Sequence, residues 1–323
     1  MPAVHVLQTS HGPGEGQAVK HIFVINPAAG SHNRQAELAG LCRQGAMGRD
    51  LEYEILVTER PGHGVELVRR ACLQAGGAHL RLYAVGGDGT LNEIARGALG
   101  MWNVAIGHFP VGTGNDFIKT FGDRAPLFRK LGNLVEGEEI PVDFLEANCG
   151  GALNVLSVGV DARVAAGMRK YKRLPLMHGQ WPYVLSTAEN IIRGLGETYR
   201  VTLDGKKYDG SYSMIYVGNG RWYGGGFHPV PEADPSDGLV DVLLVRTVTR
   251  RLAARVIGAY KRGEYAQYPH LITHVQAKEL TISREDKRPM HVNLDGEIAL
   301  SDTVQARLRQ DLKFIVPRQH REG

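Results

Sequence analysis

The most informative stretch of this chain reads Val85-Gly86-Gly87-Asp88-Gly89-Thr90-Leu91-Asn92-Glu93. The apolar run Leu80 to Val85 predicts a buried strand. Three glycines within four positions then let the backbone turn sharply and approach a ligand closely. Thr90 and Glu93 have the S/T-x-x-E spacing of a capping box, which predicts that a helix begins here. The alternative is an ordinary tight turn between a strand and a helix.

A strand, a glycine turn and a helix N-terminus together favour binding of an anion. Backbone N–H groups and the positive end of the helix dipole face the same point, and phosphate is the usual ligand of such a turn. Asp88 lies inside this turn, where its carboxylate would repel a phosphate unless a divalent cation bridges the two. The stretch therefore predicts a phosphate site that works with a metal ion.

The segments around this stretch alternate between strand and helix patterns. Strands are predicted at His21 to Ile25, Tyr53 to Val57 and Val104 to Gly107, and the segments between them have helical spacing. That order is typical of a doubly wound parallel α/β sheet, in which ligands bind at the carboxyl ends of the strands. The residues that directly follow the predicted strands, and so share one rim, are Asn26, Thr58, Gly87 and Gly112. Neither the P-loop motif nor the dinucleotide-binding motif of the Rossmann fold is present.

From about Ile140 the pattern changes to strands in series, separated by turn residues such as Asp204-Gly205. This arrangement predicts an antiparallel β-sandwich or barrel. Two inserted helices are predicted, over residues 161–171 and 183–192. The domain boundary is expected near Pro141, and residues 1–19 are expected to form a mobile leader.

Three further stretches allow a functional and a structural interpretation. Asp234 and Asp237 lie three apart in a Pro/Gly-rich loop, which suits either a hard cation or Asx turns that need no ion. Asp295-Gly296 between two strands is typical of a hairpin turn. The basic cluster Arg169 to Arg173 could contact anionic lipid or simply be a solvated helix end.

The composition is that of an ordinary soluble protein of 323 residues with a mild net charge of +4. No apolar run approaches 18 residues and no secretory signal is recognisable, so no transmembrane segment is expected. Three scattered cysteines suit a reducing compartment. A cytoplasmic location is expected, with peripheral membrane association left open and no nucleic-acid partner.

Two motifs carry a resemblance to a known family. Gly86-Gly87-Asp88-Gly89-Thr90 resembles the signature shared by diacylglycerol kinases, sphingosine and ceramide kinases and NAD kinases. Pro110-Val111-Gly112-Thr113-Gly114-Asn115-Asp116 matches the second motif of the lipid-kinase branch, P-x-G-T-x-N-D, at every specified position. The pair is similar to the soluble diacylglycerol kinase catalytic domain, and the resemblance extends from about Ile22 to Val316.

The resemblance implies ATP and Mg²⁺ as cofactors and assigns roles to individual residues. Asp295 would be the general base, with Asp88 and Asp116 as the other catalytic carboxylates. A structural Mg²⁺ would be held by Asp234, Asp237 and the carbonyl of Leu239. The last strand would return to the first domain, giving an α/β domain of residues 20–140 plus about 305–317 and a β-rich lipid-substrate domain of residues 141–304. The expected nucleotide-binding residues are Asn26, Thr58, Gly86, Gly87, Gly89, Thr90, Gly112, Thr113, Asn115 and Glu297.

The sequence therefore leads to the hypothesis of a lipid kinase acting at a membrane surface. It would transfer the γ-phosphoryl of ATP to a lipid hydroxyl, most simply converting diacylglycerol to phosphatidate. Sphingosine, ceramide or phosphatidylglycerol are alternative acceptors. A non-catalytic, lipid-binding regulatory homologue is the alternative from another functional class, and a homodimer is left open.

Overall fold

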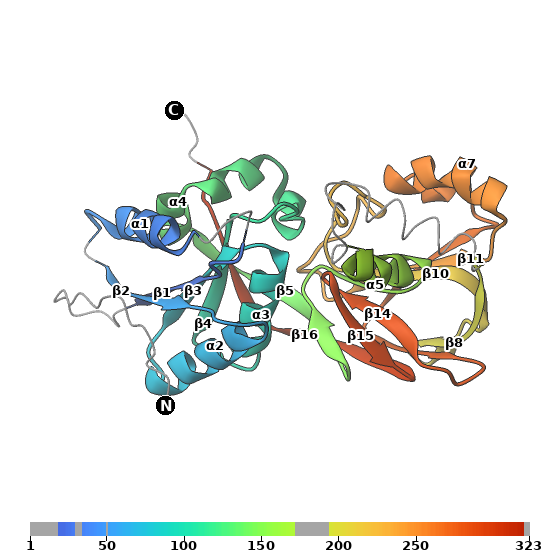
Figure 1. Ribbon diagram of the computed structural model, residues 1–323, viewed down its shortest axis with the longest axis horizontal. Helices are drawn as coiled ribbons and strands as arrows, with labels where there is room; N and C mark the ends of the chain where they lie inside the picture. The colour runs from blue at the N-terminus through green and yellow to red at the C-terminus, as the bar shows by residue number, and fades with distance from the viewer. Residues whose placement is uncertain (1–18, 30–33, 50, 172–193, 320–323) are drawn as a thin grey trace. The chain divides into compact units, whose positions relative to one another are not determined.

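The computed structural model describes residues 19–29, 34–49, 51–171 and 194–319, without the side chains of 168–171 (Figure 1). Two compact units divide the chain, unit 1 with Met1–Val142 and Gln310–Gly323, and unit 2 with Asp143–Arg309. The predicted helix over 183–192, residues 1–18 of the predicted leader and the side chains of the basic cluster at 169–173 lie outside what is described. No helix among the described residues is long and apolar enough to cross a membrane.

Unit 1 is built on a parallel sheet. Its strands are β1 (Lys20–Ile25), β2 (Glu52–Val57), β3 (Leu80–Gly86) and β4 (Val104–Pro110), in the order β4-β3-β1-β2. The end of the long strand β16 (Thr303–Val316) pairs in parallel with β4, Lys313 opposite Ala105 and Phe314 opposite Ile106. Most residues of β1, β3 and β4 are buried on both faces, as the near-continuous apolar runs predict.

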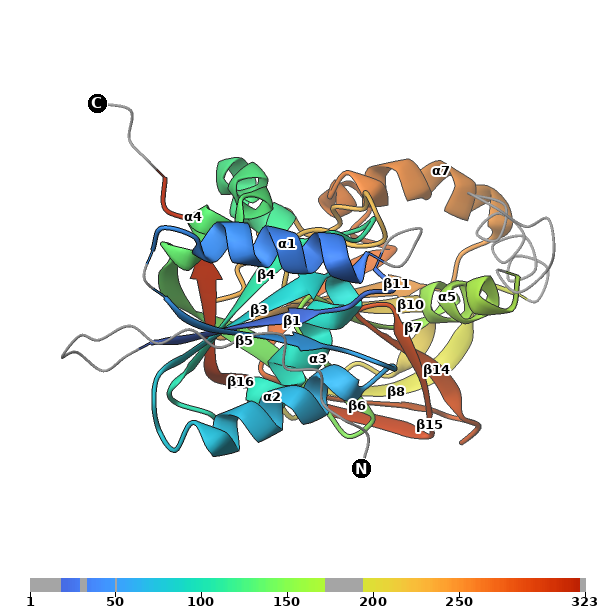
Figure 2. The same ribbon diagram turned by 60° about the vertical axis from the view of Figure 1, so that its left-hand side comes forward.

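Helices cover both faces of this sheet (Figures 1 and 2). One face carries α1 (Gln35–Ala46) and α4 (Leu131–Val135), and the other carries α2 (His63–Gln74) and α3 (Asp88–Ala98). A 3₁₀ segment, η1 (Phe117–Arg129), follows the second glycine motif. The predicted doubly wound α/β architecture is confirmed for this part of the chain.

The helix after the first motif begins three residues earlier than a capping box would place it. Gly87 is the N-cap of α3, and Thr90 is already the third helical residue. The Glu93 carboxylate instead accepts the backbone N–H groups of Gly62 and Gly64, each at 2.8 Å, at the start of α2. The capping-box prediction was therefore wrong, because Glu93 satisfies the N-terminus of the neighbouring helix rather than that of its own.

Unit 2 is an antiparallel β structure, as predicted. β10 organises it, pairing along its length with β7, β8 and β11. β14 joins β7 to β15, while β13 joins β8 to the first part of β16. The strands are β5 (Glu138–Ala147), which enters from unit 1, β6 (Gly150–Ala152), β7 (Val155–Gly159), β8 (Glu197–Leu203), β9 (Lys206–Lys207), β10 (Gly210–Gly218), β11 (Val240–Arg246), β12 (Ile272–Ala277), β13 (Glu279–Arg284), β14 (Met290–Leu294) and β15 (Glu297–Ser301).

Alternating side chains build the main core of unit 2. In β8 the residues Tyr199, Val201 and Leu203 face inward and are buried, while their neighbours are more exposed. The same alternation in β13 buries Leu280 and Ile282. This two-residue period is what a strand with one buried face requires.

Two helices lie against these strands. α5 (Val160–Tyr171) was predicted, whereas α7 (Arg250–Lys261) was missed. α7 begins at an N-cap threonine, Thr249, whose hydroxyl accepts the N–H of Leu252. It buries Val256 and Tyr260 against Leu243 and the loop before β11. A short 3₁₀ segment, η2 (Tyr265–Gln267), follows it.

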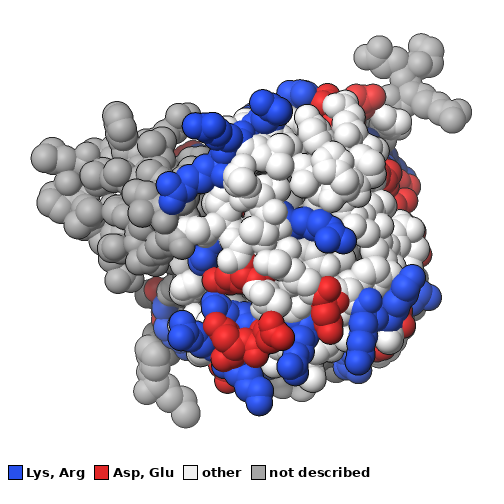
Figure 3. All heavy atoms as spheres, turned by 90° about the vertical axis from the view of Figure 1, so that its right-hand side faces the viewer, with Lys and Arg blue, Asp and Glu red and all other residues white. Residues whose placement is uncertain are grey.

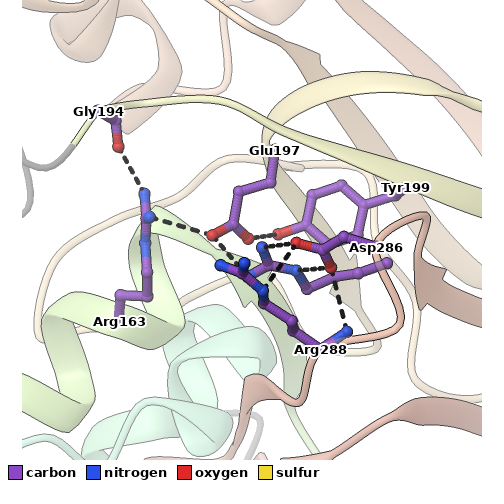
Figure 4. A network of polar contacts seen from close by, with 7 residues as sticks. Arg163, Gly194, Glu197, Tyr199, Asp286 and Arg288 are labelled. Atoms are coloured by element: carbon purple, nitrogen blue, oxygen red, sulfur yellow. Dashed lines mark hydrogen bonds and ion pairs between the residues drawn. The ribbon is translucent and has the colours of Figure 1, made fainter.

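A polar network joins α5 to the strands beneath it (Figure 4). The Glu197 carboxylate accepts from Arg163 of α5 at 3.2 Å, from Arg284 of β13 at 2.9 Å and from the Tyr199 hydroxyl at 2.5 Å. Arg163 also donates to the carbonyl of Gly194, the first residue described after the gap. Three elements distant in sequence are thus tied to one carboxylate.

The buried Asp241 of β11 forms a second ion pair, with His274 of β12. His274 Nε2 lies 2.7 Å from Asp241 Oδ1, and His274 Nδ1 lies 3.1 Å from the Tyr265 hydroxyl. The hydrogen bond to Asp241 raises the pKa of His274 above its usual 6.5, although partial burial acts the other way.

We expect this pair to make unit 2 less stable as the pH rises. A histidine whose folded pKa is raised contributes stability below its unfolded pKa of 6.5 and loses it as pH rises through the folded value. The free energy of unfolding of the parent minus that of His274→Gln should therefore fall between pH 6 and pH 8. Denaturant titrations across this range measure it, and a difference that stays constant with pH would contradict the assignment.

Candidate functional site

The two glycine motifs of unit 1 meet backbone against backbone. Gly87 and Gly112 follow β3 and β4, neighbouring parallel strands. A Cβ on Gly112 would lie 2.6 Å from the Gly87 Cα, so no side chain fits at this position. The N–H of Val111 donates to the Gly86 carbonyl at 2.9 Å and links the two loops directly. The sequence predicted that both loops share one rim, and in unit 1 they do.

Two carboxylates lie beside this glycine contact. The Asp116 N–H donates to Asp88 Oδ1 at 2.8 Å, and a Cβ on Gly114 would lie 2.8 Å from Asp88 Oδ2 and 3.7 Å from Asp116 Oδ2. Lys119 pairs with Asp116 Oδ1 at 2.5 Å. The oxygens Oδ2 of both acids are thus close to Gly114, an arrangement suited to a hard cation and its bound water.

The remaining rim residues hold the ends of β1 and β2. Asn26 Nδ2 donates to the Thr90 hydroxyl at 3.0 Å, and Asn26 Oδ1 accepts the N–H of Ala28. The Thr90 side chain covers Gly86, where a Cβ would lie 2.2 Å from Thr90 Oγ1. The Thr58 N–H donates to the Ile25 carbonyl at the end of β1. These residues shape the rim, and none of their contacts requires a ligand.

Asn115 closes the second glycine loop through its side chain. It adopts a left-handed conformation, with φ of 49°, and its Nδ2 donates to the Gly112 carbonyl at 2.7 Å. The side chain therefore closes the second glycine loop, and Asp116 occupies the N-cap position of η1. Thr113 is exposed at the tip of the loop, and Gly89 has open space around it.

His108 lies beneath the first motif and was not singled out from the sequence. It is fully buried in β4, and its Nε2 lies 3.1 Å from the Gly86 carbonyl. Burial lowers its pKa, and the nearby charge of Asp88 only partly opposes this. A neutral imidazole that supports the glycine turn is the result. A lone histidine in an apolar strand gave no signal for this role.

In unit 2, Asp295 occupies the hairpin turn between β14 and β15. Asp295 and Gly296 have φ of 50° and 88°, the pair of positive values expected of a type I′ turn. The Asp295 carboxylate accepts three backbone N–H groups, from Leu153 at 2.7 Å, Asn154 at 3.0 Å and Val155 at 2.7 Å. The turn predicted for Asp-Gly is confirmed, and its carboxylate also fixes the chain that enters β7.

Asn293 holds this turn from below. Its Oδ1 accepts the N–H of Gly296 at 2.9 Å, and its Nδ2 lies 3.3 Å from both the Ser157 hydroxyl and the Asp161 carboxylate. Burial raises the pKa of Asp161, while hydrogen bonds from Ser157 and Asn293 oppose the shift. Glu297 begins β15 directly after the turn. The Asn293 network was not predicted, because Ser157 and Asp161 are distant from it in sequence.

The acidic loop of unit 2 forms two Asx-type turns. Asp234 Oδ1 accepts the N–H of Ser236 at 3.0 Å, and Asp237 Oδ1 accepts the N–H of Leu239 at 2.9 Å. Partial burial raises the pKa of Asp237, and the charges of Asp234 and Asp241 raise it further. No group of three or more His, Cys, Asp or Glu side chains with metal-site geometry occurs among the described residues. The loop offers two carboxylates that repel each other, which a cation would relieve.

A hollow in unit 2 is lined by other residues. Its volume is about 580 Å³, and its lining includes Glu146, Thr202, Glu279 and Arg307. None of the predicted site residues lines it. The glycine loops and the Asp295 turn, rather than this hollow, are therefore the candidate functional elements.

Comparison with known protein families accounts for both units. Residues 20–147 match the diacylglycerol kinase catalytic domain, and residues 154–312 match the YegS C-terminal NAD kinase beta sandwich-like domain. Residues 20–147 belong to the diacylglycerol kinase catalytic-domain family. Both glycine motifs lie in the segment that matches the catalytic domain, and the Asp295 turn lies in the segment that matches the C-terminal domain.

Relatives of this diacylglycerol kinase family member are known in sequence and in structure. A protein of Staphylococcus epidermidis named "Putative lipid kinase" is 28% identical over 226 residues, which cover 69% of this chain and 72% of the relative. A Staphylococcus haemolyticus protein of similar name is also 28% identical, over 225 residues. A crystal structure described as a "putative diacylglycerol kinase" from Bacillus anthracis superposes with a TM-score of 0.70 at 23% identity, covering 94% of this chain and 98% of the other. The structural likeness supports the same fold.

The glycine contact predicts two different outcomes for two alanine substitutions. Gly112→Ala places a Cβ 2.6 Å from the Gly87 Cα and should lower the melting temperature as well as nucleotide binding. Gly89→Ala meets no atom within 4 Å, so the fold should be kept while a nucleotide that approaches this backbone binds at least tenfold more weakly. Calorimetry and thermal melts measure both. If Gly89→Ala binds nucleotide as well as the parent does, the ligand does not approach that turn.

The acidic loop predicts a stabilising effect of Mg²⁺. A cation between Asp234 and Asp237 would bind the folded state only, so the melting temperature of the parent should rise with Mg²⁺ concentration. Asp237→Ala should remove that rise and reduce activity, whereas Asp209→Ala, an exposed acid elsewhere in unit 2, should keep both. A melting temperature of the parent that does not respond to Mg²⁺ would contradict a structural ion.

Proposed function

We propose that this protein is an ATP-dependent lipid kinase that transfers the γ-phosphoryl group to a lipid hydroxyl, with diacylglycerol as acceptor and phosphatidate as product. The supporting observation is the close pairing of the two glycine loops with Asp88 and Asp116 beside them, in a chain of the diacylglycerol kinase family. Phosphoryl transfer depends on positioning and charge neutralisation, and backbone loops with nearby carboxylates supply the groups it needs.

Unit 1 is the nucleotide-binding part of this proposal. The N–H groups after β3 and the N-terminus of α3 would hold phosphate oxygens, with Gly87 and Gly112 leaving room for them. Bound Mg²⁺ would neutralise phosphate charge, and Asp88 and Asp116 fit it because both direct an oxygen toward Gly114. We also retain the other residues that the sequence suggested for nucleotide binding: Asn26, Thr58, Gly86, Gly89, Thr90, Thr113 and Asn115, together with Glu297 of unit 2.

Asp295 is the proposed general base. A lipid hydroxyl is a weak nucleophile, and a carboxylate that takes its proton contributes about 10²–10⁴-fold to the rate. Three backbone donors hold the Asp295 carboxylate in one orientation, so it would meet an acceptor hydroxyl in a fixed geometry. Asn293, through Gly296, fixes the turn that carries it.

A panel of lipids with labelled ATP tests the proposed reaction. The purified protein should phosphorylate diacylglycerol in mixed micelles in a Mg²⁺-dependent manner, more strongly than sphingosine, ceramide or phosphatidylglycerol. A labelled product from one of the other lipids would reassign the acceptor. Mg²⁺-dependent ATP binding without product from any lipid would overturn the kinase assignment in favour of a lipid-binding regulatory homologue.

The catalytic role proposed for Asp295 can be distinguished experimentally from its structural role in the turn. Asp295→Asn cannot offer an acceptor to all three N–H groups, so it should lower the free energy of unfolding by about 1–3 kcal/mol as well as kcat by about 10²–10⁴-fold. ATP affinity should stay within about twofold of the parent value, since the base acts on the acceptor.

A second Asp-Gly turn provides the matched control. Asp204 lies in the turn between β8 and β9 with φ of 45°. Its carboxylate accepts the N–H groups of Lys278 and Glu279 at the start of β13. Asp204→Asn should cost similar stability and leave kcat unchanged. If both variants retain more than about a tenth of the parent kcat, short of the loss expected for a base, the Asp295 carboxylate serves the turn alone.

A further inference from the structure

The segment from Arg246 to Arg262 concentrates the positive charge of the chain. It contains six Lys or Arg residues and no Asp or Glu, whereas the whole chain has a net charge of only +4. The rest of the chain therefore carries a net charge of −2. Four of the six lie on α7, namely Arg250, Arg251, Arg255 and Lys261.

α7 has one buried and one basic face. Val256, Ala259 and Tyr260 are buried in the core beneath it, and Leu252 packs against the same cluster. The opposite face exposes Arg251 and Arg255, one helical turn apart. Ile257 keeps 51% of its surface exposed and, seven residues after Arg250, lies on the same side of the helix as that arginine.

The charge on this face is largely uncompensated. Among the described residues, Arg251 and Arg255 make no ion pair, and Arg262, after the helix, pairs with Glu264 at 2.7 Å. Figure 3 shows basic side chains in a row along the upper edge of this side of the molecule, where α7 lies. α7 thus exposes two guanidinium groups that make no ion pair with a described residue and, on the side of Arg250, an isoleucine.

A short series of contacts joins α7 to the Asp295 turn. The His228 N–H donates to the Lys261 carbonyl at the end of α7, and the His228 ring stacks on Trp222 with centroids 4.0 Å apart. The Trp222 carbonyl accepts from Asn154 Nδ2 at 2.7 Å, and the Asn154 N–H donates to Asp295. A continuous series of contacts within unit 2 therefore connects α7 to Asp295, the proposed base.

We propose that the basic face of α7 is the surface through which this protein docks on anionic lipid membranes. The inference rests on the proposed function, because a lipid kinase must meet its acceptor at a membrane. Cationic residues beside an exposed apolar side chain suit the headgroup region of a bilayer. Nucleic acid would neutralise the positive charges but would offer no apolar contact to Ile257. A second copy of the same helix would be repelled by its like charge.

Vesicle binding by two charge-matched variants tests this surface. Arg251→Gln with Arg255→Gln removes two charges from α7, and Lys206→Gln with Lys207→Gln removes two exposed charges from β9. Each charge near an anionic surface contributes roughly fivefold to binding, so the α7 variant should bind phosphatidylglycerol-containing vesicles at least tenfold more weakly, and the β9 variant within about twofold of the parent. Ile257→Ser should weaken binding with the salt dependence of the parent retained.

Activity measurements separate this proposal from the proposed function. With diacylglycerol in neutral detergent micelles, the α7 variant should match the parent, and with diacylglycerol in anionic vesicles it should lose activity in proportion to binding. No activity of the parent in micelles would overturn the kinase function alone. Equal vesicle binding by the parent and both variants, or a change of oligomeric state in the α7 variant by light scattering, would overturn the docking surface alone.

Discussion

The approach of Gly87 to Gly112 is the constraint on which the candidate site of unit 1 depends. A Cβ at Gly112 has no room, and the bond from Val111 to the Gly86 carbonyl fixes the spacing of the two loops. Because the loops support each other, the positions of Asp88 and Asp116 follow from the same contact. His108 and Thr90 then contact Gly86, so the turn proposed to bind phosphate is formed without a ligand.

In unit 2 one carboxylate, that of Asp295, has several roles. Asp295 closes a hairpin, fixes the chain that enters β7 and is the proposed base. Catalytic groups gain precision when their own contacts hold them, and a carboxylate with three backbone donors has little freedom to rotate. The cost is that stability and catalysis change together on mutation, which is why the Asp204 turn is needed as a comparison.

Much of the fold could be predicted from the sequence because its signals are local. The apolar runs of β1, β3 and β4 and the glycine turns after them specify a parallel sheet, and the serial strands after Ile140 specify an antiparallel one. The partner of Glu93 could not be predicted, since it lies 29 and 31 residues away at the start of α2. α7 was missed although Thr249, Leu252, Val256 and Tyr260 carry an N-cap and helical spacing, because three arginines and Gly258 interrupt the apolar pattern of a helix of 12 residues.

The end of β16 gives the protein a particular order of completion during synthesis. Lys313 and Phe314 cover the edge of β4, roughly 200 positions after the residues with which they pair. Until they leave the ribosome, β4 presents an unpaired edge beside the glycine loops, and the sheet of unit 1 remains one strand short. A nascent or truncated chain would therefore display an open, aggregation-prone strand, so unit 1 is finished only once residues 313 and 314 have been translated.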